Sequence, residues 1–141
     1  DHGTHVELLA FPMTIEVTER TIGFFPELRQ AVPGLVRQGI YKKHFHAADL
    51  YPGSIGGSCA PAIMLFPDVV DMPYSRLEPL SKNRALETMM PQTAFVGNQD
   101  IARRELQALS RLVQQMDCYC LHFGQDVLDL PKLITPLLER S

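Results

Sequence analysis

The sequence lacks several features that would assign it to a specialised class of protein. It has no apolar run near the roughly 20 residues that a membrane-spanning helix requires, so we expect no membrane span. It has no basic excess, because 13 Lys and Arg stand against 16 Asp and Glu and give a net charge of −3. That balance argues against a dedicated nucleic-acid-binding surface. No internal repeat is present, and we expect one domain over 1–141. Since the chain begins at Asp1 and not at methionine, we interpret it as a domain excised from a longer chain or as a processed product.

Cysteine is also scarce, with three residues that cannot all pair with one another. Cys118 and Cys120 lie two apart in an expected strand, where side chains share a face but are poorly placed to form a disulfide. We interpret them as reduced, buried thiols, which favours a cytoplasmic location. A chain of this size can bury a sufficient core without a disulfide or a metal.

The strongest secondary-structure signal lies between residues 98 and 124. Apolar residues recur at helical spacing from Ala102 to Met116, which predicts an amphipathic helix. The run from Cys118 to Phe123 is typical of a buried strand. A helix that leads directly into a buried strand indicates a layer of helices on a sheet.

The remaining segments complete an α+β pattern. We expect an interrupted strand within 5–17, a helix over 25–38 that Pro33 kinks or splits in two, and a strand at the start of 40–50. A type II turn over 51–54, strands over 62–66 and 93–96 and an amphipathic helix over 130–140 follow. The sequence therefore predicts helices packed on one face of a mostly antiparallel, four- to five-stranded sheet. A ferredoxin-like arrangement with a long Pro-rich insertion is the nearest simple topology.

The Pro-rich segment 67–92 leads to our main functional hypothesis. Its prolines predict a long surface excursion with one short helix from about Lys82 to Met90, capped by Ser81. Apolar side chains in this excursion (67–91) and in the C-terminal helix favour a non-catalytic module that binds a protein partner or itself. In the alternative, both segments fold back and complete the core. The candidate contact residues are Met72, Tyr74, Leu77, Leu80, Met89, Met90, Leu133 and Leu137.

An alternative hypothesis is a metal-binding protein or metal-dependent hydrolase centred on His44 and His46. Residues two apart on a strand share a face, and both imidazoles can reach one zinc ion. His122 is a third candidate ligand if its strand is a neighbour. The surrounding string HFHAAD is similar to the HxHxDH signature of metallo-β-lactamase-like hydrolases, but it lacks the final Asp-His pair. In the simpler interpretation, these are two partly exposed histidines beside lysines.

Two further constellations are weaker. Cys118, Cys120 and His122 share one face, but residues two apart on a flat strand start about 7 Å apart, too far for short cysteine side chains to converge on one zinc. Gly57–Pro61 resembles the segment around the subtilase serine, and His2–Val6 resembles that around its histidine. The two fragments lie too close together for that fold, and no aspartate motif precedes the histidine.

A thiol or serine hydrolase using Cys59 or Ser58 is therefore the second alternative. Because no coherent catalytic set is present, the sequence favours a protein without enzymatic activity and without a cofactor, zinc being the alternative.

Overall fold

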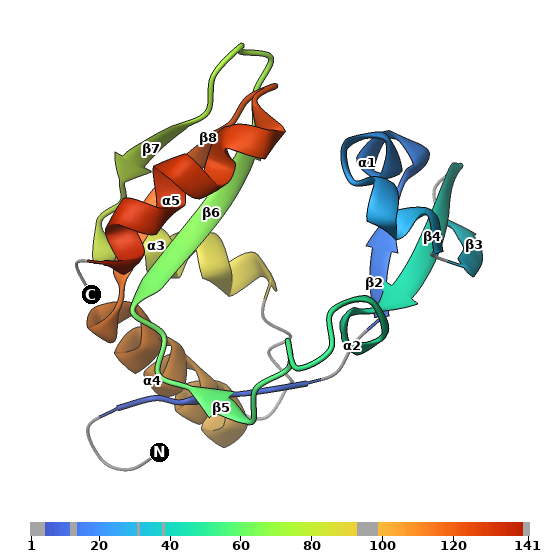
Figure 1. Ribbon diagram of the computed structural model, residues 1–141. Coiled ribbons are helices and arrows are strands. Elements are labelled where there is room, and N and C mark those ends of the chain that lie inside the picture. The colour runs from blue at the N-terminus through green and yellow to red at the C-terminus, as the bar shows by residue number, and fades with distance from the viewer. Residues whose placement is uncertain (1–4, 12–13, 31, 38, 93–98, 140–141) are drawn as a thin grey trace. The chain divides into compact units, whose positions relative to one another are not determined.

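The structure, a computed structural model, describes residues 5–11, 14–30, 32–37, 39–92 and 99–139 (Figure 1). Helices and strands are mixed along the chain, so the predicted α+β class is confirmed. The chain divides into two compact units, one formed by Asp1–Leu8 with Ala60–Ser141 and the other by Leu9–Cys59. Among the described helices, none combines the length and the apolar character that crossing a bilayer requires.

The described strands form two three-stranded sheets and a short two-stranded sheet, not one sheet of four to five strands. In the Leu9–Cys59 unit, β4 (Ile40–His46) is central and pairs antiparallel with β2 (Thr14–Val17) and β3 (Val32–Arg37). In the larger unit, β8 (Asp117–Phe123) is central, parallel to β6 (Ile63–Val69) and antiparallel to β7 (Arg76–Pro79). The strands β1 (Leu8–Leu9) and β5 (Ser58–Cys59) have two residues each. Strand periodicity predicts that a segment is extended but does not specify its pairing partner.

The core of the larger unit lies where α4 (Gln99–Gln115) and α3 (Lys82–Met89) meet β8. Helix α4 contacts both α3 and β8, and Val113 of α4 is 1% exposed. The amphipathic helix and the buried strand expected from the sequence are both confirmed. Ser81 caps α3 as predicted, since its hydroxyl accepts a hydrogen bond from the Arg84 backbone N–H. The buried cluster comprises Ala85, Val113 and Cys118, with Met64, Phe66, Leu80 and Met89 packed against it.

The other face of β8 carries Leu121, which is also buried. Successive side chains alternate between the two faces of a strand, so Leu121 faces away from Cys118 and Cys120. The short helix η3 (Val127–Asp129) leads into α5 (Leu130–Leu138), which crosses in front of β6 and β8 in Figure 1. The amphipathic C-terminal helix is therefore present, and its Leu133 and Leu137 are half-buried.

The Leu9–Cys59 unit corrects one prediction. Residues 25–38 do not form a kinked helix: a 3₁₀ helix η1 (Pro26–Gln30) is followed by strand β3. The strand accommodates Pro33 because β3 is an edge strand and its register shifts between Pro33 and Val36. Edges and bulges are the places where a sheet tolerates a residue without a backbone N–H.

The rest of this unit is built from short elements around a small core. Thr18 caps α1 (Glu19–Phe24), a helix that the sequence analysis did not predict. After β4 comes α2 (Ala47–Leu50) and then the expected type II turn, in which Ser54 N–H donates to the Tyr51 carbonyl at 3.1 Å and Gly53 has φ of 80°. The core comprises Val17, Ile22 and Leu28, with Phe25, Phe45 and Leu50 packed against it.

The irregular segment predicted over 67–92 is much shorter in the structure. Strand β6 continues through Pro67 to Val69, and β7 is a regular member of the sheet. Only the loop over 70–75 separates these strands, and α3 and η2 (Met90–Gln92) follow β7. Pro67 and Pro79 lie on β6 and β7, the two edge strands, where a missing N–H does not interrupt the central ladder. The strand expected over 93–96 lies outside the described residues.

Candidate functional site at the carboxyl end of β8

Three strand ends meet at one edge of the β6-β8-β7 sheet. Because β6 and β8 are parallel, their carboxyl ends lie at the same edge, and β7 begins there because it runs the opposite way. The register pairs His122 of β8 with Asp68 of β6 on one side and with Arg76 of β7 on the other. Side chains from all three strands therefore gather at this edge, on the sheet face that also carries Cys118.

His122 lies between two carboxylates. Its Nδ1 is 3.3 Å from Oδ2 of Asp68, and its Nε2 is 3.2 Å from Oε2 of Glu78. The imidazole is 17% exposed, whereas both carboxylates are more than half exposed. Asp68 lies directly opposite His122, whereas Glu78 is its diagonal neighbour on β7, a separation that long side chains can still bridge. The ring is thereby held on both of its nitrogen atoms.

Cys120 adds a thiol to this cluster. It is a free, half-buried cysteine on the same face as His122, and the register pairs it with Glu78. Burial raises the pKa of the thiol, the carboxylates of Asp68 and Glu78 raise it further, and Arg76 lowers it. One ligand atom from each of Asp68, Cys120 and His122 lies within 4.8 Å of the others. The cluster thus brings sulfur, nitrogen and oxygen donors together.

The loop over 70–75 is fixed to the turn that follows β8. Oδ1 of Asp126 accepts hydrogen bonds from the Ser75 backbone N–H at 2.8 Å and from the Ser75 hydroxyl at 2.5 Å. The same hydroxyl accepts a hydrogen bond from Gly124 N–H at 2.9 Å, and Gln125 N–H donates to the Met72 carbonyl at 3.0 Å. The hydrogen bond from Ser75 holds the pKa of the Asp126 carboxyl below its usual range. The loop is therefore well anchored.

Gly124 is required by the close approach of this loop. A Cβ atom added to it would lie 2.7 Å from the Tyr74 carbonyl carbon and 2.8 Å from the Met72 carbonyl oxygen. These neighbours are backbone atoms, which cannot rotate away as the end of a long side chain can. Only glycine allows the loop and the turn to pack this closely.

Apolar side chains project from the anchored loop and the strand before it. Val69 is 81% exposed, Tyr74 74% and Met72 47%. Leu128, on η3 just beyond the same turn, is 65% exposed. Single exposed apolar residues are common, but several at one sheet edge form a surface that water solvates poorly. We call Val69, Met72 and Tyr74 the apolar tip.

The structure separates the predicted partner-binding residues into two groups. Leu80 and Met89 pack against the core of the larger unit, and Leu77, Leu133 and Leu137 are half-buried. Met72 and Tyr74 in the loop are exposed, and so is Met90 in η2, at 40%. Of the residues predicted to contact a partner, the exposed ones therefore lie mainly in the loop over 70–75.

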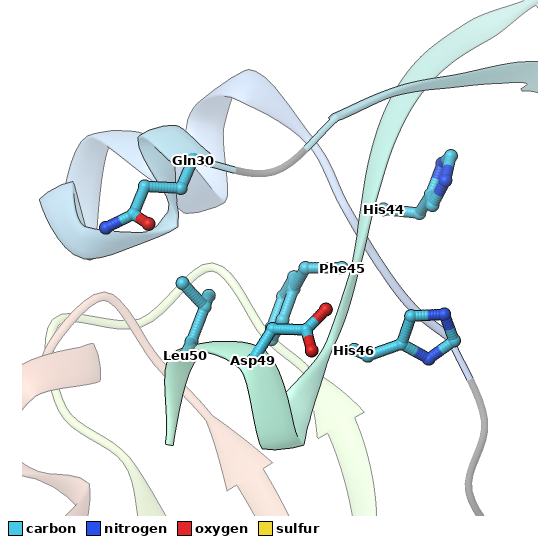
Figure 2. Close-up of a pocket in the computed structure, with 6 residues that line it drawn as sticks. All are labelled: Gln30, His44, Phe45, His46, Asp49 and Leu50. Carbon is cyan, nitrogen blue, oxygen red and sulfur yellow. The ribbon is translucent and has the colours of Figure 1, made fainter. Parts of the chain in front are cut away.

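The histidines predicted as metal ligands lie on different sheets. His44 and His46 are on β4, and Figure 2 shows their imidazoles on the same side of that strand. They line a pocket of about 170 Å³ together with Asp49, Gln30, Phe45 and Leu50. His122 is on β8, which belongs to the other three-stranded sheet and the other unit. The three-histidine site stays a prediction.

The predicted nucleophiles lie in β5. Ser58 and Cys59 are both exposed. Within the described residues of the Leu9–Cys59 unit, neither side chain forms a hydrogen bond with His44 or His46, the arrangement that would activate a nucleophile. The thiol or serine hydrolase using Cys59 or Ser58 therefore stays a prediction.

Sequence analysis missed the residues that surround His122 and those that anchor the loop. Asp68 and Glu78 lie in a Pro-rich segment whose sequence indicates irregular structure, and the sequence does not specify their register against β8. Comparison of the chain with known protein families, characterised proteins and solved structures found no match.

Proposed function

We propose that this chain is a non-catalytic module that binds a protein partner through the apolar tip. The observation that carries the proposal is an apolar loop that is both exposed and anchored. Side chains that project from a fixed backbone lose less conformational entropy on binding than those on a mobile loop. Tyrosine is among the residues that contribute most to protein interfaces, and methionine adapts to irregular surfaces.

The shape of the tip favours a partner with a concave apolar pocket. In Figure 1 the loop between β6 and β7 extends beyond the end of its sheet. A symmetric dimer needs a surface that is complementary to itself, with both a projection and the pocket that receives it. The apolar tip supplies the projection alone. A different protein that provides the pocket is therefore a better fit than a second copy of this chain.

Site-specific photocrosslinking tests the proposal. A photoreactive phenylalanine analogue in place of Tyr74, with a matched analogue in place of exposed Asn83 on α3 as the control, is introduced in cells that express the chain. We expect a discrete adduct with another protein at position 74 and not at position 83. Adding Met72→Ser should reduce the yield of that adduct severalfold, because it removes a neighbouring apolar contact.

Two outcomes would overturn the proposal. An adduct of twice the mass of the chain would show self-association in place of a distinct partner. Equal adduct yields at both positions, insensitive to Met72→Ser, would show that the tip has no preferred contact. Met72→Ser should leave the thermal unfolding of the isolated chain nearly unchanged, which separates lost binding from lost folding.

A further inference from the structure

We propose that Asp68, Cys120 and His122 bind a divalent metal ion of the zinc class, and that Glu78 orients the His122 ring. This site uses none of the three side chains of the apolar tip. It also differs from the predicted three-histidine site, because its other ligands come from the same sheet as His122.

The donor atoms of Asp68, Cys120 and His122 lie close together although two of these residues share a strand, because the histidine side chain is longer than that of cysteine and Asp68 comes from the neighbouring strand. Cys118, Cys120 and His122 follow one another along β8, where alternate side chains start about 7 Å apart. Asp68 instead lies opposite His122 on the neighbouring strand. The separation of at most 4.8 Å among the donor atoms of Asp68, Cys120 and His122 is close to the distances between ligands of one zinc ion. Bonds of about 2.0 to 2.3 Å in tetrahedral geometry place ligand atoms roughly 3.3 to 3.8 Å apart, so modest side-chain rotations close the set.

The surroundings of His122 match those of a metal-binding histidine. A coordinating imidazole almost always donates its second ring N–H to a carboxylate or carbonyl oxygen, which fixes the orientation of the ring. Here Nδ1 faces Asp68 at 3.3 Å, and Nε2 faces Glu78 at 3.2 Å. An ion held between Nδ1 and Asp68 leaves Nε2–H free to donate to Glu78. Glu78 is therefore a positioning residue, and Asp68 is a direct ligand.

The donor set selects the class of metal. A thiolate, an imidazole and a carboxylate together suit zinc or cobalt, whereas magnesium and calcium prefer oxygen alone. The carboxylates of Asp68 and Glu78 lie beside the half-buried thiol, and their negative charge favours a divalent cation, which must displace the thiol proton. Binding would release that proton, as coordination of cysteine generally does. Three protein ligands leave a fourth position for water.

Metal titration of the purified full chain tests the site. After treatment with a chelator and a reductant, the protein is titrated with Zn²⁺, Co²⁺ and, as a hard-cation control, Mg²⁺. We expect one equivalent of Zn²⁺ and of Co²⁺ to bind, with a thiolate-to-cobalt charge-transfer band in the Co²⁺ complex and no binding of Mg²⁺. Cys120→Ser should abolish the band, and Asp68→Asn should weaken binding of both metals.

Matched variants distinguish this site from the other candidate ligands. Cys59→Ser and His44→Gln should leave stoichiometry, affinity and spectrum unchanged, since they remove the exposed thiol and a histidine of the other sheet. Glu78→Gln should weaken zinc binding by about 10- to 100-fold while keeping the band, as loss of a carboxylate behind a coordinating histidine does. Asp68 and Glu78 are exposed, so their amide variants should fold.

Three results would overturn the site. A charge-transfer band that survives Cys120→Ser but disappears in Cys59→Ser would place the metal elsewhere. Zinc affinity unaffected by Asp68→Asn would remove the cross-strand ligand. Failure to bind Zn²⁺ more tightly than Mg²⁺ would exclude a thiolate site of this class. None of these measurements requires a protein partner, so each is independent of the proposed interaction function.

Discussion

Ser75 and Asp126 are 51 positions apart in the sequence, yet one carboxylate oxygen of Asp126 accepts hydrogen bonds from both the backbone N–H and the hydroxyl of Ser75. The Ser75 hydroxyl also accepts a hydrogen bond from Gly124 N–H. This pair connects the loop after β6 to the turn after β8. These hydrogen bonds hold the loop over 70–75, which carries Met72 and Tyr74 of the apolar tip, in a fixed conformation.

Ser75→Ala tests this connection. The substitution removes the hydroxyl that accepts from Gly124 N–H and donates to Asp126, so the backbone N–H of the buried residue Gly124 loses its partner. We expect the free energy of unfolding to fall by about 1 to 3 kcal/mol, and hydrogen exchange at Gly124 to accelerate. Urea denaturation with amide exchange measures both. Ser58→Ala, at an exposed position, is the control, and an equal effect of the two substitutions would contradict the prediction.

The lowered pKa of Asp126 predicts a loss of stability in acid. The main cause is the hydrogen bond from the Ser75 hydroxyl, which holds the pKa below its ordinary value of 3.8. Since the folded state binds the proton less readily than the unfolded chain, the stabilisation is complete above the unfolded pKa and is lost as pH falls through the folded pKa. The stability difference between wild type and Asp126→Asn should therefore be larger near about pH 6 than near about pH 3.

Denaturation of both proteins over this range measures the difference and cancels the effects of other carboxyl groups. Ser75→Ala in the wild-type background should reduce the acid dependence, because it removes the main cause of the lowered pKa. A difference between wild type and Asp126→Asn that does not change with pH would mean that the Asp126 carboxyl is not preferentially ionised in the folded state.

Gly124→Ala should weaken the packing between the loop over 70–75 and the turn after β8, because the added methyl group clashes with the loop backbone. The added methyl group would lie within 2.9 Å of three backbone atoms of Met72 and Tyr74, so the loop must move. We expect a loss of about 1 to 3 kcal/mol in the free energy of unfolding, the usual cost of overpacking, and faster exchange of the Gln125 amide that donates to Met72. Gly56→Ala is a matched control, because an added Cβ there meets no atom within 4 Å. A stable Gly124→Ala with unchanged exchange would show that the contact is not restrictive.

The fold was predictable where a local pattern decides the outcome. Helical spacing predicts α4, the Ser81 cap predicts α3, and the Pro52-Gly53 pair predicts the type II turn. Residues 32–37 show the limit, because Val32, Leu35 and Val36 fit a helical stripe as well as a strand. Pairing with β4 at a sheet edge decides for the strand, and a sequence pattern does not contain that pairing.

The candidate site was predictable only in part for the same reason. Cys120 and His122 share a face because they are two apart on one strand, and this follows from the sequence. Asp68 and Glu78 reach His122 only through the registers of β6 and β7 against β8, and a shift of one residue would place them on the opposite face. Likewise, Ser75 and Asp126 meet only because two distant turns lie at one sheet edge.

Val113→Ala tests the core on which the whole sheet edge depends. Val113 is 1% exposed and packs with Ala85 and Cys118, so the substitution removes buried methyl groups and leaves a cavity between α4 and β8. We expect a loss of about 2 kcal/mol in the free energy of unfolding. Val69→Ala makes the same chemical change at a position that is 81% exposed and should cost less than about 0.5 kcal/mol. Urea denaturation of the two variants measures both losses. Equal losses in the free energy of unfolding would mean that the apolar side of α4 does not pack on β8. The strand ends that bring Asp68, Cys120 and His122 together would then lack the support of this core.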